Sequence, residues 1–347
     1  MSLGWVVVHD AVEWSGRARA ALALATAVAE RAPVRVAAPA GSAILARAAA
    51  AGVKVVSWPP AATDRAVAAV LAPLAPGAWL ATSAPTLGWA AAAARRAGRG
   101  ALVRRIAVGE RPATPGRRWF GRPPAAAWVF ASRPDAEKVV LPPGSVRGGV
   151  LEPWAAPAPR RAPAVPAHVA LVVDRTPDDR AHEAMRGAAA LLRAHRDVRL
   201  VLLGEGASDD AMRVHAGALG IADRVLTGYA FDDARWIAAA VAAWVAADGD
   251  DGAYAALTAA AHGVPVLATR GTTAARGIVP GTSGEAVPVG DPHLAAGVLA
   301  HWLGDDARRR AMGNAGRERL ALLGEPSAGD VLQRAVEALR GPRSGAA

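Results

Sequence analysis

The sequence predicts an α/β fold with two Rossmann-like domains, each built on a parallel sheet. First, the chain has 347 residues, more than a single hydrophobic core usually supports. Second, short valine-rich runs alternate with alanine-rich segments of helical length, as in parallel strands joined by crossover helices. Third, a proline-rich stretch at residues 151–166 interrupts this alternation, which then starts again. Two such sheets facing each other would enclose a cleft lined by strand-to-helix loops.

Strands are expected wherever the apolar runs occur. Those before the proline-rich stretch are residues 5–9, 34–38, 53–58, 78–83, 101–108 and 127–131. Those after it are residues 169–174, 198–206, 224–229, 242–248 and 264–270. Helices are expected between the strands, among them residues 17–31 and 42–51.

These elements set the expected boundaries of the domains. The first domain is expected at residues 1–152 and the second at 167–325, with a linker at 153–166. A terminal helix is expected within 326–340, and residues 341–347 are expected to be a disordered tail. The helix should dock on a folded surface, because its apolar residues form one stripe. The stripe consists of Val331, Leu332, Ala335, Val336 and Leu339.

The composition argues against several classes of protein. The formal net charge is +10, but only Lys54 and Lys138 are lysines, and the arginines are dispersed in an alanine- and glycine-rich background. This skew is typical of a coding bias, so no nucleic-acid partner is expected. Cysteine is absent, which excludes disulfides and is compatible with a cytoplasmic protein. The eight histidines lack ligand spacing, so no metal site is expected. The longest apolar run, residues 237–247, is too short to span a bilayer, which predicts a soluble protein.

Two strand-to-helix loops carry candidate ligand-binding residues. After the expected strand at 169–174, Arg175 and Arg180 flank a turn before a long helix. Arginines at a helix N-terminus add charge-assisted hydrogen bonds to those of backbone N–H groups, which suits a diphosphate. The alternative is that both are solvated surface arginines. After the first strand, a small residue in the loop of Ser15, Gly16 and Arg17 would let a ligand approach the backbone, although a plain helix cap explains it equally well.

A third loop, DGDDGAYAALTAAAHGVPV at residues 248–266, places acids beside a glycine and ahead of a helix. Its spacing does not fit a calcium loop, because the fifth position has no acid and the twelfth no glutamate. Asp248 and Asp250 have the spacing of a D-x-D metal clamp, which is a weak motif. From this loop alone, Asp250 and Asp251 are best explained as caps of the helix. The G-x-G-x-x-G fingerprint is missing after the first strand, which disfavours a dinucleotide oxidoreductase.

Taken in order, the motifs of the second half resemble the donor-binding domain of retaining, GT-B-type glycosyltransferases of family four. The family pattern of glycine-arginine-leucine, then glutamate-lysine-glycine, lies over DRTPDDRAH without a gap. VRLVLLGEG, IADRVLTGY, AAHGVPVLAT, IVPGTSGEAVPVGDP and LGDDARRRAMGNAGRERL follow in family order and spacing. The resemblance covers residues 169–322 well, and the first half more loosely through WSGRARAAL and AGVKVV. It implies a GT-B-like fold with an acceptor domain first and a nucleotide-sugar donor domain second.

The resemblance also assigns roles to residues. Arg175 and Arg180 stand at the positions that hold the donor diphosphate. The family carries two glutamates eight positions apart, the first for the donor sugar and the second for the ribose; here the first position is Asp250, followed by Asp251, and the second is Thr258. Thr258 cannot supply the bidentate acceptor that a ribose diol favours, so ribose binding should be weaker. The backbone N–H groups assigned to the diphosphate are those of Gly252, Ala253 and Tyr254.

The activity implied by the resemblance is transfer of a hexose from a nucleoside-diphosphate sugar to an acceptor, with retention at the anomeric carbon and without a metal or cofactor. Its transition state would be oxocarbenium-like, and no residue is assigned as general base. Two further departures from the family are Ala181 in place of a glycine at the phosphate turn, and LATSAPT in place of a segment that often has a histidine. These departures favour the alternative of a catalytically inactive scaffold that binds a partner or a glycan.

A basic stretch at residues 104–124 surrounds Trp119 and Phe120 with arginines. An exposed loop of this kind can rest on an anionic membrane or bind a lipid-linked or phosphorylated glycan acceptor. The alternative is a solvated loop with both rings in the core. The expected location is the cytoplasm, with peripheral contact at the inner membrane face as one option. The terminal helix would, by the resemblance, return to the first domain.

Overall fold

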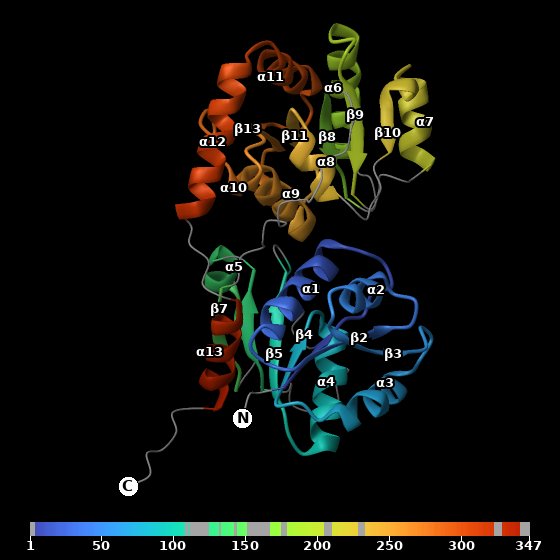
Figure 1. The fold of residues 1–347 in the computed structure, drawn as a ribbon, viewed down its shortest axis with the longest axis vertical. Helices are drawn as coiled ribbons and strands as arrows, with labels where there is room; N and C mark the ends of the chain where they lie inside the picture. The colour runs from blue at the N-terminus through green and yellow to red at the C-terminus, as the bar shows by residue number, and fades with distance from the viewer. Residues whose placement is uncertain are drawn as a thin grey trace. The chain divides into compact units, whose positions relative to one another are not determined.

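The computed structural model of the chain describes residues 4–107, 110, 125–131, 133–141, 144–150, 167–174, 179–204, 210–227, 233–322 and 328–340. The chain divides into two compact units, Met1–Glu152 with Glu325–Ala347, and Pro153–Gly324. Each unit has its own parallel sheet and core (Figure 1). The expected linker at 153–166, the expected tail at 341–347 and Arg175 lie outside the described residues.

The first unit holds a seven-stranded sheet of order β3-β2-β1-β4-β5-β6-β7, in which each neighbouring pair is parallel. Its strands are β1 (Trp5–Val8), β2 (Val34–Pro39), β3 (Lys54–Trp58), β4 (Ala78–Ala81), β5 (Ala101–Ile106), β6 (Ala127–Phe130) and β7 (Val146–Val150). Its helices are α1 (Gly16–Ala29), α2 (Ala43–Ala50), α3 (Asp64–Leu71), η1 (Ala72–Leu74), α4 (Ala84–Ala97), α5 (Arg133–Lys138) and α13 (Ala328–Arg340). The strand order reverses between β1 and β4, so their carboxyl ends form the switch point of this sheet.

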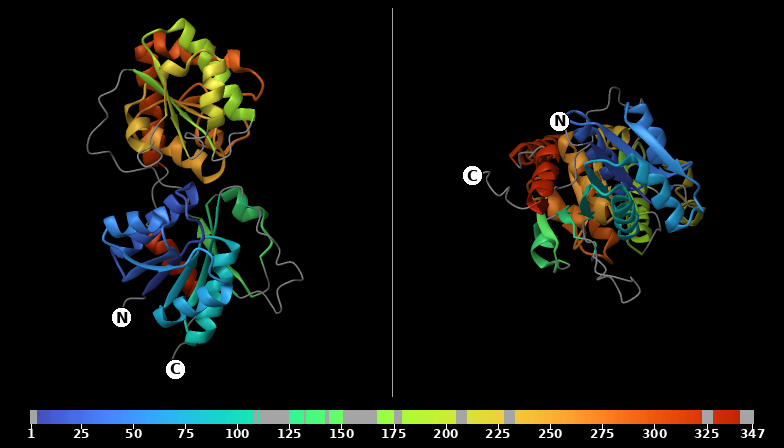
Figure 2. Two further views of the ribbon diagram at one scale, coloured as in Figure 1. Left: turned by 90° about the vertical axis from the view of Figure 1, so that its right-hand side faces the viewer. Right: turned by 90° about the horizontal axis from the view of Figure 1, so that it is seen from below.

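Helices cover both faces of this sheet, which explains why β1 and β4 are buried along their whole length (Figure 2). On one face, Val6 and Val8 pack in a core cluster with residues of α3 and α4. Alternate side chains of a strand point to opposite faces, so the intervening residues face α1, α2 and α13. Wholly apolar strands such as WVVV are the expected result of burial on both faces.

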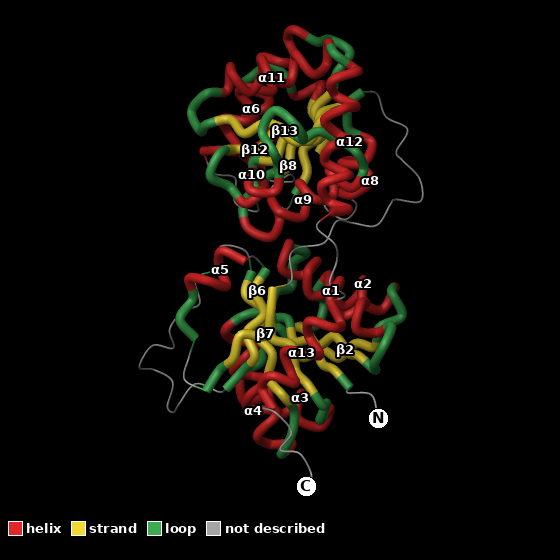
Figure 3. Tube along the Cα trace, turned by 90° about the vertical axis from the view of Figure 1, so that its left-hand side faces the viewer, coloured by secondary structure: helices red, strands yellow, loops and turns green. Residues whose placement is uncertain are grey.

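α13 belongs to the first unit although it comes from the far end of the chain. It packs against β5, β6, β7 and α1, and Figure 3 shows it beside β7. Four of its five stripe residues are buried and Leu339 is half-buried. β7 allows the close approach because Gly148 has no side chain where Ala335 packs. Asp330 of α13 also forms an ion pair with Arg31, which follows α1.

The second unit holds a six-stranded parallel sheet of order β10-β9-β8-β11-β12-β13. Its strands are β8 (His168–Val172), β9 (Arg199–Leu203), β10 (Val225–Thr227), β11 (Ala242–Val245), β12 (Val266–Thr269) and β13 (Gly284–Val287). Its helices are α6 (Asp179–Ala194), α7 (Asp210–Ala218), η3 (Ala222–Arg224), α8 (Asp233–Ala239), α9 (Gly249–Ala261), α10 (Thr273–Gly277), α11 (Pro292–Gly304) and α12 (Asp306–Leu322). The switch point of this sheet lies between β8 and β11.

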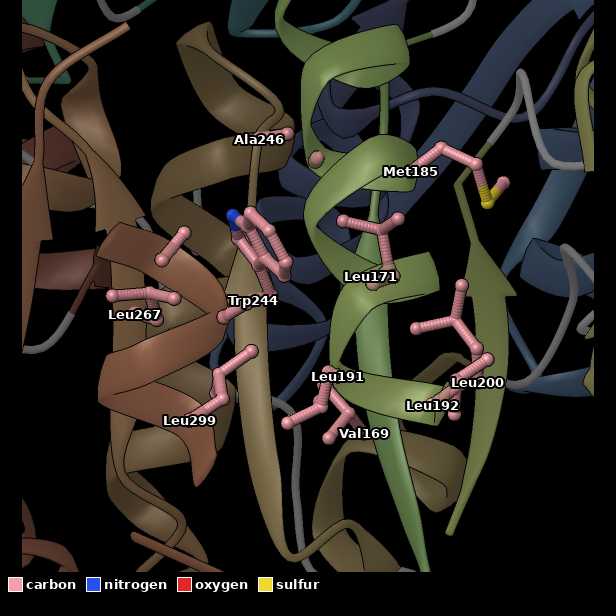
Figure 4. Close-up of a cluster of buried hydrophobic side chains, with 14 of the residues drawn as sticks. Val169, Leu171, Met185, Leu191, Leu192, Leu200, Trp244, Ala246, Leu267 and Leu299 are labelled. Carbon is pink, nitrogen blue, oxygen red and sulfur yellow. The ribbon is translucent and has the colours of Figure 1, made fainter. Parts of the chain in front are cut away.

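Two core clusters flank the second sheet. On one face, α6 and α11 pack over the strands through residues such as Leu171, Met185, Trp244 and Leu299 (Figure 4). On the other face, an alanine-rich cluster packs α8, α9 and α10 against the same strands. Small side chains let α9 lie close to β11 and β12, which holds the start of α9 near the switch point.

The fold class predicted from the sequence is confirmed, because both sheets are parallel throughout and belong to α/β units. Two strands were not predicted. β7 has the sequence VRGGV, whose glycines break the valine run, and β13 is the short segment GEAV. Among the described residues, no helix combines the length and the apolar character needed to cross a bilayer.

Candidate functional site

The switch point of the second sheet carries two acids on neighbouring strands. β8 and β11 pair in parallel from Val169 and Ala242 onward, so their carboxyl ends lie side by side. Asp174 follows β8 and Asp248 follows β11. Both are held in place by a hydrogen bond between them, because the backbone N–H of Asp248 donates to Oδ1 and Oδ2 of Asp174 at 3.1 and 3.2 Å. Ligands of open parallel sheets bind at such switch points.

Asp248 is the N-cap of α9. Its Oδ1 accepts the N–H of Gly249 at 2.8 Å and the N–H of Thr273 at 2.9 Å, which ties β11 to the start of α10. The hydroxyl of Thr273 donates to the carbonyl of Gly249 at 2.8 Å. Burial alone would raise the pKa of Asp248, but hydrogen bonds from Thr273 and Gly249 and the charge of Arg180 hold that pKa below its ordinary value. The carboxylate is therefore charged at neutral pH.

Arg180 stands between the two acids. Its Nη2 lies 3.1 Å from Oδ2 of Asp174, and its Nη1 lies 3.4 Å from Oδ2 of Asp248. The three side chains are 23%, 28% and 42% exposed for Arg180, Asp174 and Asp248, so solvent reaches all of them. Arg180 is in the first turn of α6, which adds the positive end of a helix dipole. The result is a guanidinium and two helix N-termini gathered at the switch point.

The switch point of the first unit is also polar, and reasoning from the sequence missed it. The hydroxyl of Thr82 donates to the carbonyl of Val8 at 3.1 Å, so its oxygen accepts from Nδ1 of His9, also at 3.1 Å. Ser83 donates to Oδ2 of Asp10 at 2.6 Å. Nε2 of His9 and Oδ1 of Asp10 are buried, and neither has a hydrogen-bond partner in the described structure. Burial lowers the pKa of His9 to about 4, with Asp10 opposing the shift and Arg17 adding to it, so the ring is neutral.

Both interpretations of the basic stretch at residues 104–124 treat it as a loop, and this is wrong for its first two arginines, which also fall in the expected strand at 101–108. Arg104 and Arg105 lie in β5 and are 2% and 1% exposed. Arg104 forms an ion pair with Glu110, and burial lowers the pKa of Arg104 to about 10. Residues 108–109 and 111–124, with both aromatic rings, lie outside the described residues.

The family comparison matches the second unit. Residues 164–319 match the model of the family Glycosyl transferases group 1, a range that contains Asp174, Arg180 and all of α9. No curated protein matches the sequence.

Solved structures match the whole chain. Anabaena HepE in complex with UDP-glucose has a TM-score of 0.74 at 13% identity, over 98% of this chain and 100% of that chain. A glycosyltransferase from Rickettsia africae ESF-5 has a TM-score of 0.70 at 12% identity, over 98% of this chain and 100% of that chain. Sucrose-phosphate synthase from Thermosynechococcus elongatus has a TM-score of 0.67 at 15% identity, over 98% of this chain and 100% of that chain.

The chain has the GT-B glycosyltransferase fold. In this GT-B chain, the residues predicted to bind the donor diphosphate through backbone N–H groups lie within α9. The N–H of Gly252 donates to the carbonyl of Asp248 at 3.1 Å, and those of Ala253 and Tyr254 come later than the four groups that an α-helix leaves without an intrahelical partner. The N–H groups at the start of α9 are instead those of Gly249, Asp250 and Asp251, of which that of Gly249 already donates to Oδ1 of Asp248.

Gly252 has a packing role in this GT-B unit. A Cβ at Gly252 would overlap the carbonyl oxygen of Ala247 and lie 3.0 Å from Oγ1 of Thr273. The absence of a side chain lets the first turn of α9 approach the end of β11 and the start of α10. The capping role expected for Asp250 and Asp251 belongs to Asp248, because α9 begins at Gly249 rather than after Asp251.

The residues predicted to contact the donor sugar and the ribose differ in burial. Asp250 is 9% exposed, Asp251 is half-buried, and Thr258 is fully buried inside α9. The Thr258 hydroxyl is therefore not accessible to a ribose in this structure. Ala181 is also buried, with its methyl group in the core cluster under α6.

The loop of Ser15, Gly16 and Arg17 was expected either to admit a ligand or to cap a helix. Ser15 is the N-cap of α1 and accepts the N–H of Ala18 at 3.2 Å, Gly16 is the first helical residue, and Arg17 follows it. The plain-cap interpretation therefore accounts for the Ser15 side chain.

Within the described residues, no group of three or more histidine, aspartate or glutamate side chains is placed to hold a metal ion.

Proposed function

We propose that this chain is a retaining glycosyltransferase of family four that transfers a hexose from a nucleoside-diphosphate sugar to an acceptor, without a metal ion or cofactor. One observation carries the proposal. Arg180 lies beside the first turn of α9 at the switch point of the second sheet, inside the range matched by the family model. A guanidinium and a helix N-terminus are the groups that bind a diphosphate and stabilise its charge as it leaves.

The proposed mechanism assigns each unit a task. In the second unit, Arg180 and the N-termini of α6 and α9 stabilise the charge that develops on the departing diphosphate. Asp250, two residues after the cap of α9, is the acid proposed to face the donor sugar. We place the acceptor on the first unit, where the switch point between β1 and β4 carries Asp10 and Ser83. In the single displacement proposed here, the acceptor oxygen bonds to the anomeric carbon from the face on which the bond to the diphosphate breaks, and the acceptor's proton passes to the departing diphosphate. Positioning both substrates is therefore the main catalytic task.

UDP is the first nucleotide to test. The similar structures of HepE were obtained with UDP-glucose, with UDP and glucose, and with UDP. A UDP-sugar donor is our proposal for this chain by similarity of fold. The acceptor class that we propose is a lipid-linked or phosphorylated glycan, and the proposed location is the cytoplasm, with peripheral membrane contact. Sedimentation with neutral and with anionic vesicles tests that membrane contact. Failure to bind either kind of vesicle would contradict it.

A second candidate function is a glycosyltransferase-like scaffold without turnover. The observation that favours it is the state of the donor site: Arg180 is already paired with Asp174 and Asp248, and Thr258 is fully buried. Such a site offers less free positive charge to a diphosphate than an unpaired arginine would.

Calorimetry with UDP, GDP and ADP separates the two candidates, and a hydrolysis screen over nucleotide sugars then identifies the donor. Arg180→Met should weaken nucleotide binding at least tenfold, because it removes the proposed diphosphate ligand. Arg186→Met is the matched control, since Arg186 is a surface residue of the same helix, 47% exposed and 3.9 Å from Glu183. NMR of the product's anomeric proton tests retention, and activity in EDTA tests metal independence. No nucleotide binding at millimolar concentration would end the enzyme proposal.

A further inference from the structure

The carboxylate of Asp174 has the surroundings of a bound anion. It accepts the backbone N–H of Asp248 on both oxygens and the guanidinium of Arg180 on Oδ2. Backbone N–H groups and arginine at a switch point are the donors that phosphate oxygens use in α/β proteins. From this geometry, and building on the proposed function, we propose that Asp174 occupies the anion-binding position of the donor site and competes with the donor diphosphate for Arg180.

The resemblance of DRTPDDRAH to the family pattern implies a different residue at position 174. In the pattern that lies over DRTPDDRAH, Asp174 stands at the glycine that precedes the arginine. A glycine leaves the space beside position 180 without a side chain, whereas Asp174 fills it with a carboxylate. The acid therefore supplies from within the chain the negative charge that a ligand would otherwise bring.

The balance of charge makes this competition costly for a diphosphate. Arg180 has one positive charge and contacts two carboxylates, those of Asp174 and Asp248. A diphosphate placed against Arg180 would meet Asp174 as a neighbouring like charge, and such contacts oppose binding. Binding therefore requires the Asp174 carboxylate to rotate away.

Asp174 is placed where such a displacement is possible. Its side chain is 28% exposed and that of Arg180 is 23% exposed, so neither is locked inside the core. Asp248 is more exposed, at 42%, but its Oδ1 is fixed by capping bonds to Gly249 and Thr273. We therefore expect the Asp174 carboxylate to move when a diphosphate binds, while Asp248 keeps its position.

The test is removal of the Asp174 charge with the fold kept. Asp174→Asn keeps a carbonyl oxygen for the N–H of Asp248, and Asp174→Gly restores the residue of the family pattern. Both variants should bind UDP and inorganic pyrophosphate about tenfold more tightly than the native chain, measured by calorimetry. Asp179→Asn is the matched control, because this exposed acid is one residue from Arg180 and its removal changes the net charge equally. The control should leave both affinities within about twofold.

A second arm assigns the gain to Arg180. In the double variant Asp174→Asn with Arg180→Met, the gain in pyrophosphate affinity should disappear, since the freed guanidinium is its source. Thermal unfolding of each variant shows that it is folded. If Asp174→Asn and Asp174→Gly are folded and bind pyrophosphate no more tightly than the native chain, the inference is overturned.

The outcomes separate this inference from the proposed function. Tighter pyrophosphate binding by the Asp174 variants, with no binding of UDP, GDP or ADP by any form, supports the anion position and overturns the nucleotide-sugar proposal. Turnover of a UDP-sugar by the native chain, with unchanged affinities in both Asp174 variants, supports the enzyme and overturns the competition.

Discussion

Nη1 of Arg180 lies 3.4 Å from Oδ2 of Asp248, and this contact connects the start of α6 to the cap of α9. The two residues belong to different strand-to-helix loops, which meet because β8 and β11 are neighbours in the sheet. Asp248 thus has two roles: Oδ1 caps α9 and binds α10, while Oδ2 faces Arg180.

The two roles of Asp248 can be separated by substitution. Asp248→Ala removes the cap and should lower the free energy of unfolding of the second unit by about 1 to 2 kcal/mol. Asp248→Asn keeps an oxygen for the cap and should cost less than half as much, because the partly exposed ion pair contributes little. Urea unfolding measures both. Equal losses in the two variants would show that charge, rather than capping, sets the role of this residue.

The buried His9 predicts that the first unit loses stability in mild acid. Its pKa is about 4 in the fold against the ordinary histidine value of 6.5, so the unfolded chain binds more protons between these values. The contribution of the neutral His9 ring to the free energy of unfolding is complete above pH 6.5. It falls as the pH drops towards 4, by up to about 3 kcal/mol. Hydrogen exchange of β1 and β4 measures this slope. His9→Gln should flatten it, whereas His301→Gln, in the exposed part of α11, should not.

How far the sequence predicts this fold can be judged from β1 and β7. β1, WVVV, is apolar along its whole length because helices cover both faces of the sheet, and such a run is visible without coordinates. β7, VRGGV, has no such run. Its glycines are explained by the close packing of α13, which comes from the other end of the chain. Local pattern therefore predicts the central strands, whereas the edge strand β7 depends on long-range packing against α13.

The same difference between local pattern and long-range packing holds at the proposed donor site. Arg180 could be assigned from its place at the start of a helix. Its pairing with Asp174 and Asp248 depends on which strands are neighbours, and no local pattern contains that information. The His9 and Ser83 contacts at the first switch point depend on strand order in the same way. The burial of Thr258 follows from which face of α9 packs on the sheet.

The docking of α13 predicts that the two ends of the chain stabilise one unit. Leu332 is fully buried, so Leu332→Ala should lower the free energy of unfolding of the first unit by about 2 to 4 kcal/mol. Gln333→Ala, on the exposed side of the same helix, should change it by less than about 0.5 kcal/mol. Hydrogen exchange resolved by unit measures the effect. Equal destabilisation of both units by Leu332→Ala would contradict the assignment of α13 to the first.

Two helical glycines of the second unit predict opposite effects of the same substitution. Gly252→Ala puts a methyl group against the carbonyl oxygen of Ala247 and near Thr273, so the first turn of α9 must shift, and stability should fall by about 1 to 3 kcal/mol. Gly297→Ala, in α11, places its methyl group in open space and should raise stability by about 1 kcal/mol, because alanine favours the helix. Urea unfolding measures both variants. Since the start of α9 is also the proposed diphosphate site, Gly252→Ala should weaken UDP binding as well, while Gly297→Ala should leave it unchanged. A stabilising Gly252→Ala would show that α9 does not pack as closely on β11 as described.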